Sequence, residues 1–246
     1  MPLRFLTALP TPPPMMDHGA QPLLPLAGLT ILAVEDSRFA SEALRLLCQR
    51  SGARLRRAET MQAARSHLCV YRPDVMIVDL GLPDGRGERL IRDLARQGPR
   101  IPLLLGTSGD PTGRAAALAA GAAGFLDKPL ESLAAFQRAI LRLLPDRAYL
   151  LDSGAADGPP LAPDPLALHD DLARAADLAR GMAGGAGNGG DYLAGFVSGL
   201  ARSSHDAALE QAACAALAEP GGMNRLARLL STRVAAADGA FTRPGG

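Results

Sequence analysis

Strand-like segments and amphipathic helices alternate along residues 29–145. The pattern predicts strands at residues 29–34, 54–58, 75–78, 101–105 and 124–126. It predicts a helix after each of these strands, at residues 37–50, 60–71, 85–97, 110–121 and 133–144. Such alternation with short connections is typical of a doubly wound α/β domain, in which helices cover both faces of a five-stranded parallel sheet.

Three local features are predicted within this α/β domain. Phe39 is expected to share the apolar side of the first helix with Leu47, because the two positions have helical spacing. Asp84 and Gly85 are expected to form an ordinary turn. Asp110 is expected to cap the helix that it precedes.

The chain changes character on either side of this domain, which is predicted to span residues 28–145. Residues 1–27 are rich in proline and predict a disordered leader, and residues 146–165 have the composition of a linker. Helical spacing returns at about 165–180, 192–201, 206–217 and 222–234. We therefore expect a small all-α helical domain at 166–236, followed by a disordered tail at 237–246.

Polar side chains follow four of the five predicted strands. Glu35 and Asp36 come directly after the first strand, Asp79 after the third, Thr107 after the fourth and Lys128 after the fifth. In a parallel sheet the ligand site lies beyond the carboxyl ends of the strands. These three carboxylates, the hydroxyl and the ammonium are therefore expected to converge at one edge of the sheet.

The chemistry of this cluster points to phosphoryl transfer. Three neighbouring carboxylates repel each other unless a cation lies beside them, and ligands that are all oxygen suit a hard ion such as Mg²⁺. An aspartate such as Asp79 can act as a nucleophile toward a phosphoryl group. The Thr107 hydroxyl can donate to a phosphoryl oxygen, and the Lys128 ammonium offsets its charge.

Four segments of this chain together resemble the receiver domain of two-component response regulators. They are Val34–Asp36, Asp74–Gly85, Pro102–Ser108 and Gly121–Pro129, which are in the family's order and at workable spacing. The resemblance covers just under half of the chain and implies a flavodoxin-like fold. It also implies that the protein is a phosphoprotein of a phosphorelay pathway.

The resemblance assigns a role to each residue of the cluster. It implies that Glu35, Asp36 and Asp79 hold Mg²⁺, with the carbonyl of Gly81 as a further ligand. It also implies that Asp79 accepts a phosphoryl group from a partner histidine kinase or phosphotransfer protein.

The resemblance also implies a conformational switch. It implies that Thr107 and Lys128 contact the phosphoryl group, and that Thr107 moves inward when this group is present. The family's switch aromatic falls on Phe125, where many members have tyrosine. Apart from the Mg²⁺-dependent phosphorylation and dephosphorylation of its own receiver domain, the chain is not expected to be an enzyme.

Composition changes the interpretation of one residue. The chain contains 26 lysines and arginines, and Lys128 is the single lysine among them. A compact ammonium and a planar guanidinium are not interchangeable at a tight site. The position of Lys128 therefore favours a function that arginine does not serve.

The second half of the chain is predicted to contact a downstream protein or a second copy of this chain. Residues 151–246 hold seven arginines and eleven acidic residues, a net charge of −4. A duplex-binding module needs a basic face, so nucleic acid is not an expected partner. Two alternatives remain open: a phosphorelay intermediate that uses His169 in a degenerate phosphotransfer domain, and a DNA-binding transcription regulator.

The apolar runs also bear on location. No uninterrupted run reaches the roughly 18 residues of a membrane span. The N-terminal segment lacks the apolar centre of a secretory signal. We therefore expect a cytoplasmic protein with no membrane partner.

Overall fold

The computed structural model describes residues 24–98, 103–153, 164–183 and 189–241. Five parallel strands form the central sheet of the first part, in the order β2-β1-β3-β6-β7. Their bounds are Thr30–Val34 (β1), Arg54–Ala58 (β2), Val75–Asp79 (β3), Leu103–Ser108 (β6) and Gly124–Asp127 (β7). This arrangement confirms the doubly wound, flavodoxin-like sheet. A two-residue hairpin that the sequence did not predict, Gly81–Leu82 (β4) with Gly85–Arg86 (β5), follows β3.

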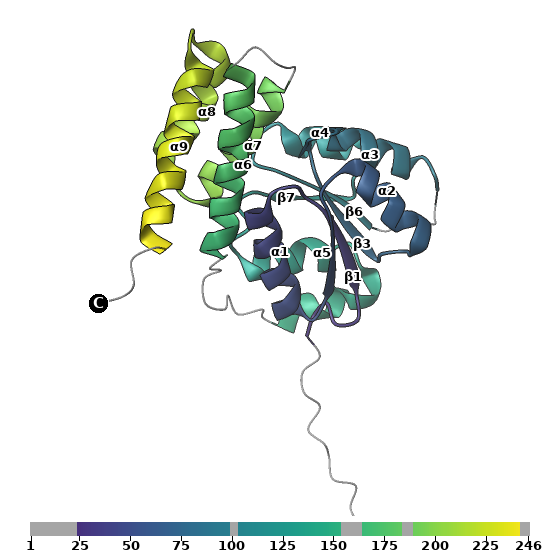
Figure 1. The fold of residues 1–246 in the computed structure, drawn as a ribbon. Coiled ribbons are helices and arrows are strands. Elements are labelled where there is room, and N and C mark those ends of the chain that lie inside the picture. Colours follow the sequence, from purple (N-terminus) through teal and green to yellow (C-terminus); the bar gives the residue numbers. More distant parts are fainter. Residues whose placement is uncertain (1–23, 99–102, 154–163, 184–188, 242–246) are drawn as a thin grey trace, which may run out of the picture.

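Helices cover both faces of the sheet (Figure 1). Their bounds are Arg38–Ser51 (α1), Met61–Val70 (α2), Gly87–Ala95 (α3), Gly113–Ala120 (α4) and Leu133–Leu141 (α5). One apolar core lies between the sheet and α2, α3 and α4, and a second lies between the opposite face and α1 and α5. Because both faces are covered, the interior positions of β1 and β3 are almost entirely apolar and buried.

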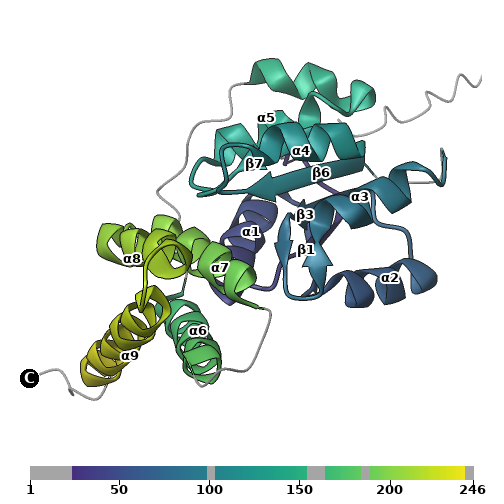
Figure 2. The ribbon, with the colours of Figure 1, turned by 90° about the horizontal axis from the view of Figure 1, so that it is seen from above.

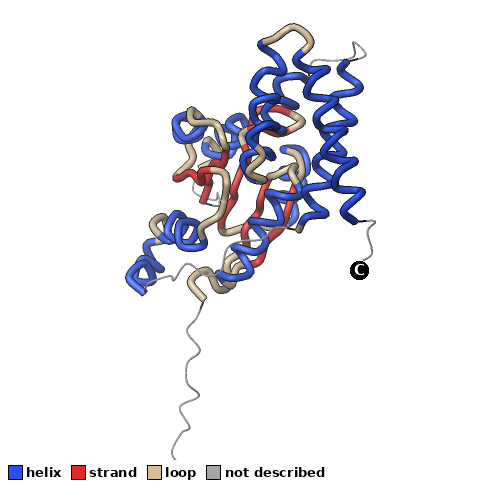
Figure 3. The backbone as a smooth tube through the Cα atoms, turned by 90° about the vertical axis from the view of Figure 1, so that its left-hand side faces the viewer, coloured by secondary structure: helices blue, strands red, loops and turns tan. Residues whose placement is uncertain are grey.

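The second part of the described chain is a bundle of four helices beside the sheet (Figures 2 and 3). Their bounds are Pro165–Ala183 (α6), Gly190–Ser203 (α7), Ala207–Ala218 (α8) and Gly222–Phe241 (α9). We call these four helices the helical domain. Asp206 caps α8 as its position suggests, because its carboxylate accepts a hydrogen bond from the amide of Leu209 at 3.0 Å.

Phe39 does not lie where the sequence placed it. Leu44 and Leu47 of α1 pack into the core between the sheet and α1 and α5, whereas Phe39 packs into the apolar core of the helical domain. The Phe39 side chain is buried there with Leu172 and Phe196. The prediction that Phe39 and Leu47 share one apolar side of α1 is therefore wrong, because α1 buries two different faces against two different partners.

Several predicted boundaries also need correction. Leu26 is fully buried in the core between the sheet and α1 and α5, so the packed chain begins before residue 28, and residues 1–23 lie outside the described part. The predicted linker at 146–165 opens with a 3-10 helix, Pro145–Ser153 (η1). Its Leu150 packs on the core between the sheet and α1 and α5. At the other end, α9 continues to Phe241, into the predicted tail.

One predicted capping residue acts differently from the prediction, and one predicted turn residue makes further contacts. Asp110 does not cap α4 directly, because the helix begins at Gly113 and the Asp110 carboxylate accepts from the amide of Thr112 at 2.7 Å. Asp84 is more than a turn residue. Its carboxylate accepts from the amides of Met61 and Gln62 at 3.0 Å each, and so satisfies the N-terminus of α2.

Candidate functional site: an acidic pocket at the carboxyl edge of the sheet

The structure brings the predicted polar residues together at the carboxyl edge of the sheet. Carboxylate oxygens of Glu35, Asp36 and Asp79 lie within 4.8 Å of one another, and all three residues are buried. Asp79 and Thr107 are register partners at the ends of β3 and β6. Lys128, directly after β7, completes the group, which we call the acidic pocket.

Lys128 links two of the three carboxylates. Its ammonium nitrogen lies 2.6 Å from Glu35 Oε2 and 2.9 Å from Asp79 Oδ2. Burial by itself disfavours the charge on Lys128, but the adjacent Asp79 and Glu35 carboxylates outweigh it and raise its pKa. Lys128 is therefore held as a cation against a carboxylate oxygen of Asp79.

Burial and the neighbouring negative charges raise the pKa values of two of the carboxylates. Burial raises the pKa of Glu35 to about 8; Lys128 opposes this rise, and the charges of Asp79 and Asp36 add to it. Burial also raises the pKa of Asp36, against a hydrogen bond from Tyr192 that lowers it. A further cation beside these oxygens would relieve this repulsion.

Two buried polar atoms of the pocket lack partners among the described residues. Asp36 Oδ1 and Thr107 Oγ1 are buried and have no hydrogen-bond partner among the described residues. Buried polar groups normally have partners, so such atoms call for a ligand. The oxygen donors of Glu35, Asp36 and Asp79 fit Mg²⁺, which prefers carboxylate ligands.

The two remaining predicted site residues lie next to this pocket. Gly81 opens β4, and its amide is 3.4 Å from Asp79 Oδ1. Phe125 on β7 is buried beside Gly106, its register partner in β6, which directly precedes Thr107. The Arg114 guanidinium lies 5.2 Å from the centre of the Phe125 ring.

The helical domain contributes side chains that the sequence did not single out for the site. The hydroxyl of Tyr192 on α7 donates to Asp36 Oδ2. Arg174 on α6 lies 3.2 Å from the same oxygen and 3.1 Å from the Asp36 carbonyl oxygen. Burial and the Asp36 carboxylate together raise the pKa of the Tyr192 hydroxyl, which therefore remains a donor.

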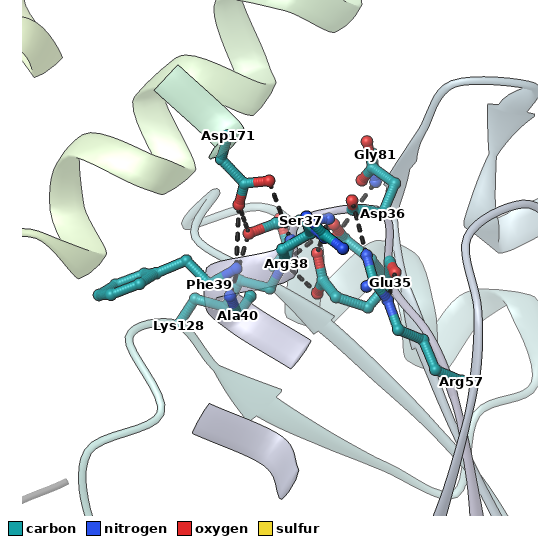
Figure 4. A network of polar contacts seen from close by, with 12 residues as sticks. Glu35, Asp36, Ser37, Arg38, Phe39, Ala40, Arg57, Gly81, Lys128 and Asp171 are labelled. Carbon is teal, nitrogen blue, oxygen red and sulfur yellow. Dashed lines mark hydrogen bonds and ion pairs between the residues drawn. The ribbon is translucent and has the colours of Figure 1, made fainter. Parts of the chain in front are cut away.

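A third residue of the helical domain holds the first turn of α1 (Figure 4). The Asp171 carboxylate accepts from Ser37 Oγ at 2.7 Å and from the amides of Arg38 and Phe39 at 3.0 Å each. Asp171 is almost completely buried. It thus satisfies donors of a helix that lies far away in the sequence.

Neither histidine of the helical half lies against Asp79. His169 on α6 pairs through Nε2 with Asp238 of α9 at 2.9 Å. His205, after α7, lies 3.2 Å from Glu131. His169 thus joins α6 to α9, and His205 connects the helical domain to the loop between β7 and α5. Neither contact points to the acidic pocket.

Comparison with known proteins identifies the first part of the chain. Residues 31–140 match the family model of the response regulator receiver domain. The chain is 40% identical over 100 residues to the KDP operon transcriptional regulatory protein KdpE of Escherichia coli, covering 40% of this chain and 44% of KdpE. It is 36% identical over 130 residues to the response regulator MprA of Mycobacterium ulcerans, covering 52% and 54%. The chain thus spans about half the length of the curated relatives it matches.

Solved structures resemble the same portion. A putative response regulator from Chloroflexus aurantiacus matches with 30% identity and a TM-score of 0.42, over 49% of this chain and 98% of the other. The receiver domain of the sensor histidine kinase PA1611 from Pseudomonas aeruginosa, described with a coordinated magnesium ion, matches with 25% identity and a TM-score of 0.43, over 47% and 97%.

The comparisons change two predictions about function. Because KdpE is named a transcriptional regulatory protein, they do not support the expectation that nucleic acid is not a partner. They do not support the phosphorelay alternative through His169 either. Separately, every helix in the described parts of the chain is too short or too polar to cross a membrane.

Proposed function

Because residues 31–140 are a response regulator receiver domain, we propose that this chain is a response regulator phosphorylated on Asp79 by a partner histidine kinase or phosphotransfer protein. The contact that carries this proposal is the 2.9 Å pairing of Asp79 Oδ2 with Lys128 Nζ, beside two further buried carboxylates. Phosphorylation is proposed to change the contacts between the receiver domain, the helical domain and a downstream protein.

The residues of the pocket divide the transfer step between them. A carboxylate oxygen of Asp79 forms a bond to phosphorus while the bond from phosphorus to the donor's histidine nitrogen breaks. That nitrogen keeps the electron pair, and because the other ring nitrogen of the donor carries a proton, the donor leaves as a neutral imidazole. Lys128 Nζ stays within reach of the new phosphoryl oxygens, and Thr107 Oγ1 supplies an unused donor.

Glu35, Asp36 and Asp79 would hold the metal of this site. Mg²⁺ bound there would neutralise charge on the phosphoryl oxygens. Burial of the three carboxylates favours this occupancy, because a further cation would relieve their remaining mutual repulsion.

Labelling with acetyl phosphate tests this function. In the presence of Mg²⁺, we expect a hydroxylamine-sensitive phosphoryl group on Asp79, which borohydride trapping and mass spectrometry can locate. Chelation of Mg²⁺ with EDTA should prevent the labelling. A stable label on another residue, or labelling that EDTA leaves undiminished, would contradict the proposal.

Phe125 is proposed to report the phosphorylated state. Its ring packs so closely against Gly106 that a methyl carbon there would come within 3.2 Å of the ring, and a movement of the neighbouring Thr107 would therefore reach Phe125 through Gly106. With Mg²⁺ and beryllofluoride, a phosphoryl mimic, we expect the NMR signals of both Thr107 and Phe125 to shift. Unmoved signals in a protein that has bound the mimic would exclude this switch.

Transcription regulation is a second candidate, favoured by the name of the KdpE relative. It requires residues of the helical half to hold duplex DNA despite their net negative charge. Retention of the phosphorylated full-length chain on DNA, weakening steeply as salt rises, would favour this candidate. Capture of a protein partner without such retention would favour a protein contact as the output.

A further inference from the structure

The helical domain covers the edge of the sheet that holds the acidic pocket. Helix α7 reaches this edge at both of its ends. Tyr192 near its start contacts Asp36, and Arg202 near its end donates to the carbonyl of Gly109 in the loop after β6. Between these contacts α7 also packs against β4, which follows Asp79 in the chain. The helical domain therefore approaches the same groups that phosphorylation would use.

The three carboxylates of the pocket have different partners. Lys128 pairs with Glu35 and Asp79, whereas Arg174 and Tyr192 hold Asp36. Among the described residues, Lys128 and Arg174 are thus the cations that pair with these carboxylates, while Arg57 of β2 donates to the backbone carbonyls of Glu35 and Asp36. The Asp36 carboxylate belongs to the proposed Mg²⁺ site, yet its cationic partner, Arg174, comes from outside the receiver domain.

The position of Arg174 opposes a metal ion. Its guanidinium lies 3.2 Å from Asp36 Oδ2 and is held in place by the Tyr192 hydroxyl at 3.0 Å and by the Phe196 ring, whose centre is 5.3 Å away. A divalent cation on the unpartnered Oδ1 of Asp36 would still lie close to this fixed positive charge on the same carboxylate, and like charges at such distances repel. The Tyr192 hydroxyl also uses a lone pair of the same carboxylate.

We propose that Arg174 and Tyr192 compete with Mg²⁺ for Asp36, so that docking of the helical domain and loading of the receiver pocket oppose each other. This inference rests on the proposed function, since it assigns the regulation of that site. Coupling between two binding events is reciprocal. Mg²⁺ together with a phosphoryl group therefore weakens the docking of the helical domain, and removing Arg174 and Tyr192 strengthens Mg²⁺ binding.

The first turn of α1 would report the release of the helical domain. Asp171 accepts from the amides of Arg38 and Phe39, while the receiver's own Ser37 hydroxyl accepts from the amide of Ala40. When the helical domain leaves, α1 keeps its own cap but loses the partner of two amides. These two amides should then exchange with solvent faster than the rest of the helix.

Calorimetric titration of the full-length chain with Mg²⁺ alone tests the competition. Tyr192→Phe keeps the ring, and Arg174→Gln removes the charge while keeping most of the side chain. We expect the double variant to bind Mg²⁺ about tenfold more tightly, as hydrogen bonds to a charged group of ordinary strength imply. Two controls, Tyr149→Phe and Arg180→Gln, alter an exposed tyrosine and an arginine on α6 that pairs with Asp177.

The outcomes of this titration separate the two proposals. Unchanged affinity in the double variant would overturn the competition, and weaker binding would show instead that Arg174 and Tyr192 support the metal site. Either result would leave phosphorylation of Asp79 intact. If neither the wild type nor the double variant bound Mg²⁺, the proposed function would fail as well.

Hydrogen exchange gives a second measurement that does not depend on these variants. Adding Mg²⁺ and beryllofluoride to the wild type should accelerate exchange at the amides of Arg38 and Phe39. Phe39→Ala should accelerate it without either addition, because Phe39 anchors α1 in the core of the helical domain. Protection that persists in the wild type loaded with beryllofluoride would overturn the proposed opposition.

Discussion

Replacing Asp79 by asparagine should abolish phosphoryl incorporation from acetyl phosphate. An amide oxygen is a far weaker nucleophile than a carboxylate, although asparagine has nearly the same shape. The fold should persist, because the substitution removes one of three mutually repelling buried charges. Phosphate labelling and thermal unfolding of the same preparation measure the two effects.

A matched substitution controls for the loss of a carboxylate as such. Asp93→Asn changes an aspartate on α3 that pairs with Arg65 at the surface, and it should leave labelling at the level of the wild type. If Asp79→Asn takes up label as fast as Asp93→Asn, Asp79 is not the acceptor. If it unfolds instead, beryllofluoride-dependent shifts in the wild type still decide whether the pocket binds a phosphoryl mimic.

The acidic pocket could be predicted because its positions follow from one rule of sheet geometry. Asp79 and Thr107 are far apart in the sequence, but both end neighbouring parallel strands, and the register places them side by side. Apolar runs of strand length located those ends. The polar residue after each run then identified the pocket with little reference to side-chain packing.

The partners from the helical domain could not be predicted in the same way. Tyr192 and Arg174 lie on helices whose pattern shows which positions are apolar but not which other domain they meet. Docking of α6 on α1 sets these contacts, and it depends on tertiary packing across more than a hundred residues of chain.

Replacing Lys128 by methionine should destabilise the protein more than any surface substitution. The change leaves Glu35 and Asp79 buried without their ammonium partner, and breaking such a buried pair costs roughly 3–5 kcal/mol. The loss should appear in chemical unfolding without Mg²⁺. Added Mg²⁺ should restore part of it, because a cation bound by the same carboxylates again offsets their charge.

A surface pair of similar composition provides the comparison. Arg65→Met breaks the exposed pair with Asp93, which we expect to cost less than about 1 kcal/mol and to be insensitive to Mg²⁺. A Lys128→Met protein as stable as the wild type without Mg²⁺ would show that the carboxylates do not depend on the ammonium.

Lys128→Arg separates the charge of this residue from its shape. The variant keeps a positive charge between Glu35 and Asp79, so it should fold with most of the wild-type stability. Its planar guanidinium is larger than the ammonium, whose side chain is only 10% exposed and whose nitrogen lies within 3 Å of both carboxylates. We therefore expect the beryllofluoride-dependent shifts of Thr107 and Phe125 to be reduced. Full shifts in this variant would mean that the single lysine of the chain could equally be an arginine.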